Sequence, residues 1–418
     1  MVDESLPLRS LFLDLNAYFA SVEQQEDPSL RNRPIAVVPM LADSTCVIAA
    51  SYQAKAYGIK TGTLVGEAKL KCPELLLMTG RPALYAHYHQ KVLDAVDRVL
   101  PVEKVASIDE MRFALIGEER VPAEAVRIAG RLKAAIREHV GVCMTSSIGI
   151  APNGFLAKLG TDMRKPDGLV VIEHHQIPAI FEGLKLTDFV GINRRMEVRI
   201  KAAGIFTPMD LYAANPLQLR RAFGSIVGER WYYMLRGQEV EPEESDQKSL
   251  SHSHVLPPDL RSETGCREVL LRLISKAAAR LRSKGLWAGQ VTFYVRGFDR
   301  SWKWSSRMPP THDTLLLNEL FGRAWTTRDF KRPRGVGLAF GELTTAEAVT
   351  PSLFDGGHSR EKFNEALDRV NKKFGKNSVF LAGMEHAKDT ADEKIAFNKT
   401  WLFSEGKGDN EWVEPNGS

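Results

Sequence analysis

Three acidic residues of this chain lie inside or directly after apolar segments, where an uncompensated charge is costly. Asp14 interrupts the apolar run 11–15, and the adjacent pair Asp109 and Glu110 follows the apolar segment 102–108. A lone carboxylate among hydrophobic side chains is unfavourable, and neighbouring carboxylates repel each other. Two strands that lie side by side would bring the three acids together, and a cation would then offset their repulsion.

Oxygen ligands of this kind favour a hard divalent cation such as Mg²⁺ or Mn²⁺. Held together with substrate phosphates, such ions form the two-metal arrangement of phosphoryl and nucleotidyl transfer. A plainer interpretation stays open from the residue types alone. Asp109 and Glu110 could form a turn at a strand end, because acidic residues are common in turns, and Asp14 could be a paired charge in the core.

Five short segments, taken in chain order, resemble the motifs of Y-family (translesion) DNA polymerases. They are 14–23 (DLNAYFASVE), 51–55 (SYQAK), 107–110 (SIDE), 155–158 (FLAK) and 165–168 (KPDG). Each is weak alone, but all five in the family's order are specific, and a weaker similarity continues to about residue 345. The resemblance implies a template-directed DNA polymerase that adds deoxyribonucleotides to a primer 3′-hydroxyl with low fidelity and bypasses DNA damage.

The resemblance also implies a multidomain α/β fold of the right-hand polymerase type. The expected parts are an α/β palm (1–16 and 83–172), small fingers (17–82), a helical thumb (173–237), a linker (238–250), an α/β little finger (251–345) and a partly disordered C-terminal tail (346–418). The apolar periodicity of the palm agrees, since strands at 9–15, 107–113 and 143–150 alternate with amphipathic helices at 86–101 and 121–140.

By the same resemblance, Asp109 and Glu110 are the catalytic acids of a centre with two Mg²⁺ ions, for which Mn²⁺ is an alternative. The expected metal ligands are Asp14, the backbone carbonyl of Leu15, Asp109 and Glu110. Two residues depart from the family pattern. Asn16 stands where many relatives have Asp, at a position that is not an expected ligand. Arg112 could alter the carboxylate shell or simply face solvent.

The incoming deoxyribonucleotide is assigned by the resemblance to a further set of residues, namely Tyr18, Phe19, Ala49, Tyr52, Lys55 and Lys165. Phe19 would be a steric gate whose ring clashes with a ribose 2′-hydroxyl, and the two lysines would contact the triphosphate. The residues alone permit simpler interpretations: core packing for Phe19, an exposed pair for Tyr52 and Lys55, and a surface turn for Lys165. The spacing of Lys158 and Lys165 predicts one face of a helix that ends at Pro166.

Charge distribution favours a nucleic-acid partner for the later part of the chain. Residues 251–345 hold 16 Lys or Arg against 8 Asp or Glu, which attracts a phosphate backbone but is also compatible with a solvated surface. Primer-template DNA is expected to contact a helix-hairpin-helix in 189–207 and the little finger; the residues are Gly191, Asn193, Arg194, Arg280, Arg296 and Lys303. Asn193 stands where a glycine with positive φ is common. Trp302 and Trp304 are most simply a half-buried strand face, and His252 and His254 part of a polar linker.

In the tail, Leu353 and Phe354 resemble the end of a peptide that docks on the sliding clamp, although the leading glutamine of that peptide is absent. The 418 residues exceed one typical domain, and the four cysteines have no CxxC spacing, which argues for reduced thiols. We find no long apolar run and expect a cytoplasmic monomer without a membrane span. Two alternatives stay open: a catalytically silent relative that binds DNA and clamp as an adaptor, and a nucleotidyl cyclase, which the basic segment disfavours.

Overall fold

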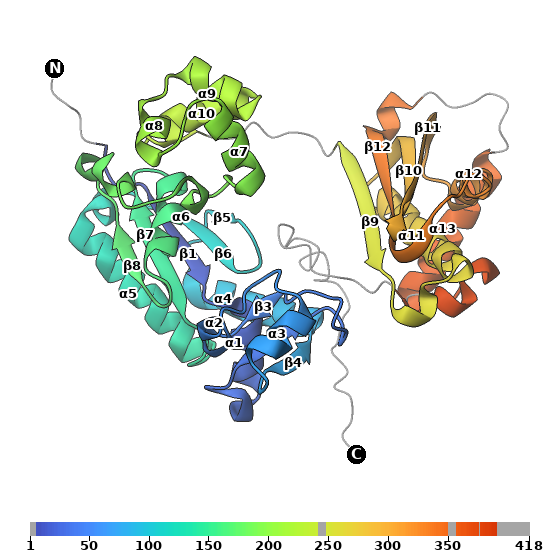
Figure 1. Cartoon of the computed structure of the whole chain (residues 1–418), viewed down its shortest axis with the longest axis horizontal. Helices are drawn as coiled ribbons and strands as arrows, with labels where there is room; N and C mark the ends of the chain where they lie inside the picture. The colour runs from blue at the N-terminus through green and yellow to red at the C-terminus, as the bar shows by residue number, and fades with distance from the viewer. Residues whose placement is uncertain (1–5, 241–247, 350–356, 376, 391–418) are drawn as a thin grey trace. The chain divides into compact units, whose positions relative to one another are not determined.

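The computed structural model describes residues 6–240, 248–349, 357–375 and 377–390 and divides the chain into two compact units (Figure 1). The first unit holds the described residues up to 240, and the second holds those from 248 to 390. Across these ranges, no helix has the length and apolar character needed to cross a membrane.

A mixed five-stranded sheet forms the centre of the first unit. Its strands run in the order β5-β6-β1-β7-β8, with β1 antiparallel to β6 and β7, and β8 parallel to β7. The strands are β1 (Ser10–Leu15), β5 (Lys104–Val105), β6 (Glu110–Ala114), β7 (Ser146–Ala151) and β8 (Leu169–Val171). All six residues of β1 are buried, so both faces of the central strand are covered.

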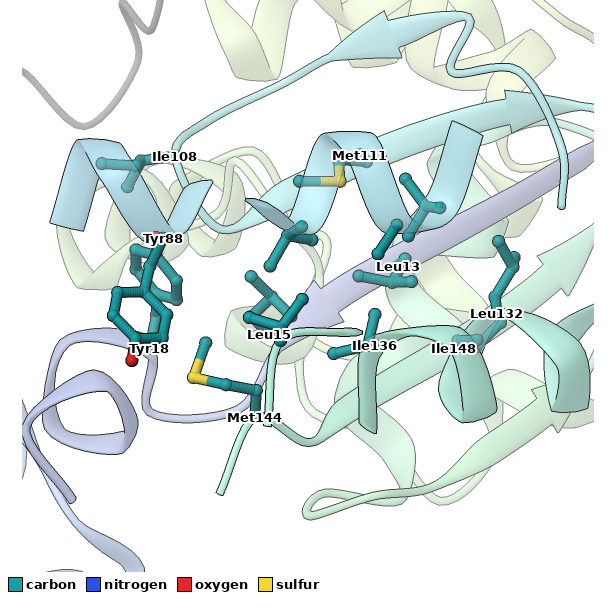
Figure 2. Close-up of a cluster of buried hydrophobic side chains, with 14 of the residues drawn as sticks. Leu13, Leu15, Tyr18, Tyr88, Ile108, Met111, Leu132, Ile136, Met144 and Ile148 are labelled. Atoms are coloured by element: carbon teal, nitrogen blue, oxygen red, sulfur yellow. The ribbon is translucent and has the colours of Figure 1, made fainter. Parts of the chain in front are cut away.

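The two faces of β1 meet different helices, because successive side chains of a strand point to opposite faces. Its leucines pack against α4 (Pro82–Asp97) and α5 (Pro122–His139) in the apolar cluster that Figure 2 shows. The opposite face packs against α6 (Gly154–Met163), which comes so near to β7 that a Cβ on Gly149 would lie 1.9 Å from a carbonyl oxygen of that helix. Asp14 therefore lies on the α6 side of the sheet.

The strand predicted to start at residue 107 begins later than expected. The structure places residues 107–109 in the bend that joins β5 to β6. Of the motif 107–110, only Glu110 belongs to strand β6. The reason is the hairpin itself: the backbone amides of Ala106 and Ser107 donate to the Glu110 carbonyl and close the turn. Asp109 is thus a turn residue next to the strand that carries Glu110.

Residues between the first strand and α4 form a small layer with its own core. The three-stranded sheet has the order β3-β2-β4. Its elements are α1 (Tyr18–Glu26), β2 (Ile35–Val38), β3 (Ala49–Ala50), α2 (Tyr52–Ala56), α3 (Val65–Lys71) and β4 (Leu76–Thr79). Ser51 caps α2 by accepting a hydrogen bond from the Ala54 amide.

Four short helices follow the palm-like sheet. They are α7 (Arg194–Ala202), α8 (Pro208–Ala213), α9 (Pro216–Phe223) and α10 (Ile226–Met234). Asn193, Thr207 and Asn215 cap the first three through their side chains, which is why short helices can begin there. Turns of 3₁₀ type lie at Pro28–Leu30, Gly117–Arg120, His174–Gln176, Ala179–Phe181, Leu186–Asp188, Pro258–Leu260, Ala346–Ala348 and Ala382–Ala387.

The second unit is an antiparallel sheet with helices on one face. The strand order is β11-β10-β12-β9, formed by β9 (Ser249–Val255), β10 (Leu286–Arg300), β11 (Trp302–Thr311) and β12 (Lys331–Thr345). Helices α11 (Glu263–Ser283) and α12 (Thr314–Trp325) cover its apolar face. Trp302 is buried and Trp304 packs against this core, which confirms the strand-face prediction. The linker interpretation of His252 and His254 was wrong, because both lie in β9, where pairing with β12 extends the sheet.

Part of the segment expected as a tail folds onto the second unit. Helix α13 (Gly357–Phe374) lies in this segment. Asp368 of α13 pairs with Arg282 of α11 at 2.6 Å, and that guanidinium also donates to the His312 carbonyl. Ala387 completes the buried apolar core. These contacts attach the region to the helical face of the sheet.

Candidate active site

The strand register brings the three predicted carboxylates together. Asp14 of β1 is the direct partner of Glu110 in β6, and the Leu15 amide donates to the Asp109 carbonyl at 2.9 Å. Residues separated by about a hundred positions in the chain are therefore neighbours across one antiparallel pair. The convergence that the apolar context predicted is present.

Two lysines neutralise this acidic cluster. The Lys158 ammonium forms a very short ion pair with Asp14 and lies 3.0 Å from Glu110, and its side chain is only 12% exposed. The Lys165 ammonium lies 2.8 Å from Asp14 and 2.7 Å from Asp162. Burial would lower the pKa of Lys158, but the charges of Asp14 and Glu110 outweigh burial and raise it. Both lysines are therefore cationic at neutral pH.

The pKa of the Asp109 carboxyl reflects its burial and the negative charges around it. Burial raises the pKa of its carboxyl to about 6, and the charges of Asp14 and Glu110 act in the same direction. A hydrogen bond from the Ser107 hydroxyl, at 2.5 Å, and the charge of Lys158 oppose the rise. The three acids thus need further positive charge to be fully ionised together.

The donor set fits a divalent cation chemically. Three carboxylates offer hard oxygen ligands, and the Lys158 ammonium lies where a positive charge is needed, between Asp14 and Glu110. In the arrangement that the described residues adopt, no group of three or more His, Cys, Asp or Glu side chains is already placed around a common metal position.

Lys165 reaches the site by a different route from the one that its spacing predicted. Helix α6 ends at Met163, so Lys165 lies in the following turn and not on the same helix face as Lys158. Two side chains hold this turn. The Asn16 side chain accepts a hydrogen bond from the Asp167 amide at 2.7 Å, and the Lys133 ammonium donates to the Asp167 carbonyl at 2.6 Å.

Asn16, the departure from the family pattern, has a defined structural place. The side chain is 1% exposed and donates to the Ser147 hydroxyl at 2.9 Å, while its oxygen also accepts from Thr145 at 3.2 Å. A carboxylate could accept these hydrogen bonds but could not donate to Ser147 in its ionised form. The amide therefore links the end of β1 to the Lys165 turn without adding charge to the acidic cluster.

Arg112 neither joins the carboxylate shell nor faces open solvent. Its guanidinium pairs with Glu103 at 2.9 Å and with Glu239 at 3.0 Å, and its side chain is 18% exposed. Glu239 also accepts a hydrogen bond from the Gly154 amide at the start of α6. Arg112 thus connects the end of the four-helix segment to the helix that carries Lys158.

Tyr52 and Lys55 border the same charge cluster. The Lys55 ammonium lies 4.1 Å from the centre of the Tyr52 ring. Burial and the nearby charge of Lys165 lower the pKa of Lys55. The Tyr52 hydroxyl is buried and has no hydrogen-bond partner within the part of the chain that the structure describes. An unpaired buried donor beside the Lys55 and Lys165 ammonium groups is an expected feature of an anion site.

Phe19 and Tyr18 lie at the start of α1 and are both buried. The Phe19 ring is 6% exposed and stacks on Tyr85 with 4.4 Å between ring centres. The Tyr18 hydroxyl donates to the Tyr85 carbonyl at 2.6 Å, and its ring lies in the apolar cluster beside Tyr88 (Figure 2). Tyr18 can therefore face a ligand only through its backbone. Ala49 lies half-buried in β3.

The sequence interpretation did not identify Tyr85 or Glu23. The Tyr85 hydroxyl donates to Glu23 at 2.6 Å, and Arg81 pairs with the same buried carboxylate. Glu23 lies on the buried part of α1, where a carboxylate needs partners. Asp162, on α6 one turn after Lys158, was also missed.

The helix-hairpin-helix segment differs from the expectation in its backbone. Gly191 has φ +103°, whereas Asn193 has φ −86° and caps α7 by accepting from the Met196 amide at 2.9 Å. The prediction of a positive φ at Asn193 was wrong because the residue serves as a helix cap. Arg194 is the first residue of α7, and a shallow hollow of about 400 Å³ borders Gly191 and Asn193.

The remaining predicted DNA contacts are distributed over both faces of the second unit. Arg296 and Lys303 are exposed on neighbouring strands, since Lys303 pairs with Tyr294 in the register of β10 and β11. Arg280 lies on α11, the helix that packs against the apolar face, so the structure does not group it with the other two. Leu353 and Phe354 lie outside the described residues.

Family models and known proteins match most of the chain. The impB/mucB/samB family matches residues 13–162, and the impB/mucB/samB family C-terminal domain matches 247–353. DNA polymerase IV of Moorella thermoacetica is 33% identical over 89% of this chain and 95% of its own length. DNA polymerase IV 1 of Bacillus subtilis is 27% identical over 94% of this chain and 97% of its own length.

Solved structures show the same fold. A Y-family DNA polymerase chimera of Dbh and Dpo4 covers 81% of this chain and 99% of its own length, with a TM-score of 0.67 at 22% identity. The multidomain α/β fold is therefore confirmed. The family models and the relative that is 33% identical over 89% of this chain show that the protein belongs to the Y-family of translesion polymerases and is a DNA-directed DNA polymerase.

Proposed function

We propose that Asp14, Asp109 and Glu110 form the catalytic centre of this polymerase, with Asp109 and Glu110 closest to the reaction. The direct pairing of Asp14 with Glu110 in the sheet, next to Asp109, carries the proposal. In the reaction, the primer 3′-oxygen forms a bond to the α-phosphorus of the incoming deoxyribonucleotide. The bond to pyrophosphate breaks, and the hydroxyl loses its proton.

The three carboxylates and the Leu15 carbonyl would hold two Mg²⁺ ions, or Mn²⁺ as an alternative. When bound, such ions lower the pKa of the primer hydroxyl and stabilise the charge that develops on the phosphorus and on pyrophosphate. The family to which the chain belongs supports this cofactor, and the oxygen donor set is suited to it.

The lysines would exchange one set of anions for another during substrate binding. Lys165 contacts Asp14 at 2.8 Å, and a triphosphate would compete with the carboxylate for that ammonium. Lys55 and the unpaired Tyr52 hydroxyl would bind the same phosphates. The backbone of Tyr18 would face the triphosphate. The ammonium groups of Lys55 and Lys165, already in place before the reaction, would stabilise the leaving pyrophosphate.

Phe19 and Ala49 would select the sugar and the base of the incoming nucleotide. Phe19 would act as the steric gate against ribonucleotides, and its stacking on Tyr85 supports a fixed ring position. Ala49 would form part of a roof of small side chains over the new base pair. Such a roof checks base-pair shape weakly, which agrees with low fidelity and damage bypass.

We further propose the subdomain boundaries of the right-hand arrangement as the resemblance implies them. Gly191, Asn193 and Arg194 of the thumb, and Arg296, Lys303 and Arg280 of the little finger, would contact the primer-template backbone. Because phosphates carry no sequence information, these contacts would be independent of sequence. Leu353 and Phe354 would dock on the sliding clamp, and the polymerase would act as a monomer.

Primer extension with Mg²⁺ on intact and abasic templates tests the proposed centre. Asp109→Ala should abolish extension and leave binding of the primer-template unchanged. Asp94→Asn, which alters an exposed acid of α4, serves as the control and should extend normally. If Asp109→Ala extends primers at the wild-type rate, Asp109 does not belong to the catalytic centre.

A further inference from the structure

A buried histidine of α4 contacts the turn that presents Asp109. His89 is 5% exposed, and its ring nitrogen Nδ1 lies 2.7 Å from the Ile108 carbonyl oxygen. Ile108 is buried as well, in the apolar cluster that also holds Tyr88 of the same helix (Figure 2). A polar ring in such surroundings is costly unless it forms a hydrogen bond. The contact with the Ile108 carbonyl supplies that hydrogen bond.

The His89 ring is the donor in this contact. Burial lowers the pKa of His89, so the imidazole is neutral at pH 7 and carries one N–H group. A carbonyl oxygen can only accept, which places the hydrogen on Nδ1. Within the described ranges of the chain, His89 is the only donor to this carbonyl. The orientation of the Ile108 carbonyl therefore depends on the histidine.

The Ile108 carbonyl and the Asp109 amide belong to one planar peptide group, so fixing one fixes the other. The Asp109 amide donates to the Ser107 hydroxyl oxygen at 3.3 Å, and that hydroxyl donates to the Asp109 carboxylate at 2.5 Å. The next peptide group is held from the opposite direction, since the Leu15 amide donates to the Asp109 carbonyl at 2.9 Å. Helix α4 and strand β1 thus fix the two peptide groups that flank the Asp109 side chain.

Three hydrogen bonds therefore run in series from α4 to the Asp109 carboxylate. The first joins His89 to the Ile108 carbonyl, the second joins the Asp109 amide to Ser107, and the third joins Ser107 to the carboxylate. Hydrogen bonds in such a series polarise one another, so loss of the first weakens the others. Groups that orient a metal ligand in this way contribute strongly to metal affinity.

We propose that His89 is a positioning residue for Asp109. Through the Ile108–Asp109 peptide group it holds the carboxylate in the orientation that binds the divalent cation. His89 itself touches neither the metal nor the substrate, and it acts only through the backbone. This inference rests on the proposed metal centre of Asp14, Asp109 and Glu110 and adds a residue from the core of the unit to it.

Mn²⁺ binding to the full chain, measured by electron paramagnetic resonance at neutral pH, tests the role of the histidine. His89→Leu and His89→Asn are a matched pair, because the two new side chains have nearly the same shape and only the Asn amide can donate from the place of Nδ1. His89→Leu should weaken Mn²⁺ binding by roughly 10- to 100-fold, whereas His89→Asn should keep most of the affinity. His87→Leu removes an exposed histidine of the same helix and should change nothing.

Ser107→Ala tests the series from its other end. This variant already lacks the link to the carboxylate, so adding His89→Leu to it should weaken Mn²⁺ binding no further. In primer extension, His89→Leu should need more Mg²⁺ than the wild type to reach half of its maximal rate. Circular dichroism checks that each variant is folded. Should His89→Leu not fold, His89→Met replaces it, because it also lacks a donor and has a more adaptable side chain.

Three results would overturn the positioning role: wild-type Mn²⁺ affinity in His89→Leu, equal weakening by His89→Leu and His89→Asn, or additive losses in the double variant with Ser107→Ala. Equal weakening would show that the ring only fills space. Failure of the metal centre itself looks different. If the wild type binds no Mn²⁺, or if Asp109→Ala binds it as tightly as the wild type, the proposed centre is wrong.

Discussion

Removal of the Lys158 ammonium should make the stability of the catalytic unit depend on divalent metal. The side chains of Lys158, Asp14 and Glu110 are 12%, 8% and 28% exposed, so solvent screens their charges only partly. Two unit charges 3 Å apart attract by roughly 5 kcal/mol at an effective dielectric constant of 20. Desolvation of the ammonium offsets much of that gain, and loss of one partner from a buried pair typically costs about 3–5 kcal/mol.

Lys158→Met should therefore lower the free energy of unfolding by about 3–5 kcal/mol in the presence of EDTA. For a unit of this size the midpoint of thermal unfolding should fall by roughly 6–20 °C. Millimolar Mg²⁺ should restore more of this loss in Lys158→Met than it adds to the wild type, because the metal replaces the missing charge between Asp14 and Glu110.

The measurement is thermal unfolding followed by intrinsic fluorescence, with and without EDTA. Lys201→Met is the control, since Lys201 forms an exposed pair with Glu197 one helical turn away, and its loss should cost at most about 0.5 kcal/mol. A Lys158→Met protein as stable as the wild type in EDTA, or one that gains no more from Mg²⁺ than the wild type, would refute the electrostatic account of the site.

Four further predictions follow from the same geometry. Phe19→Ala should admit ribonucleotides in primer extension, and unchanged sugar discrimination would remove the gate assignment. Asn16→Ala should raise KM for the incoming nucleotide more than it lowers kcat, because the turn that presents the triphosphate-binding lysine loses its anchor; steady-state kinetics at saturating DNA would measure both. Mn²⁺ affinity, measured by electron paramagnetic resonance, should rise about tenfold per pH unit below the Asp109 pKa of about 6 and level off above it, since the metal binds the ionised carboxyl, and Asp109→Asn should abolish this dependence. Replacing Leu353 and Phe354 together by Ala should remove stimulation by the sliding clamp and spare basal synthesis, and continued stimulation would place the docking peptide elsewhere.

Local sequence determined which side chains could become functional. The alternation of β1 places Asp14 on the face opposite to Leu13 and Leu15, and this follows from the period of a strand alone. The motif residues Tyr52 and Lys55 lie on α2 as their spacing indicated, because a serine cap and short apolar contacts specify that helix locally. The family resemblance supplied the roles that spacing could not.

Tertiary structure decided which charges meet, because ion pairs between distant segments depend on register and on the placement of turns. The pairing of Asp14 with Glu110 comes from the register of β1 and β6, and the contact of Lys165 with Asp14 comes from a turn outside the helix that sequence spacing predicted. Sequence specifies the chemical groups, and the free energy of packing the whole chain specifies their distances.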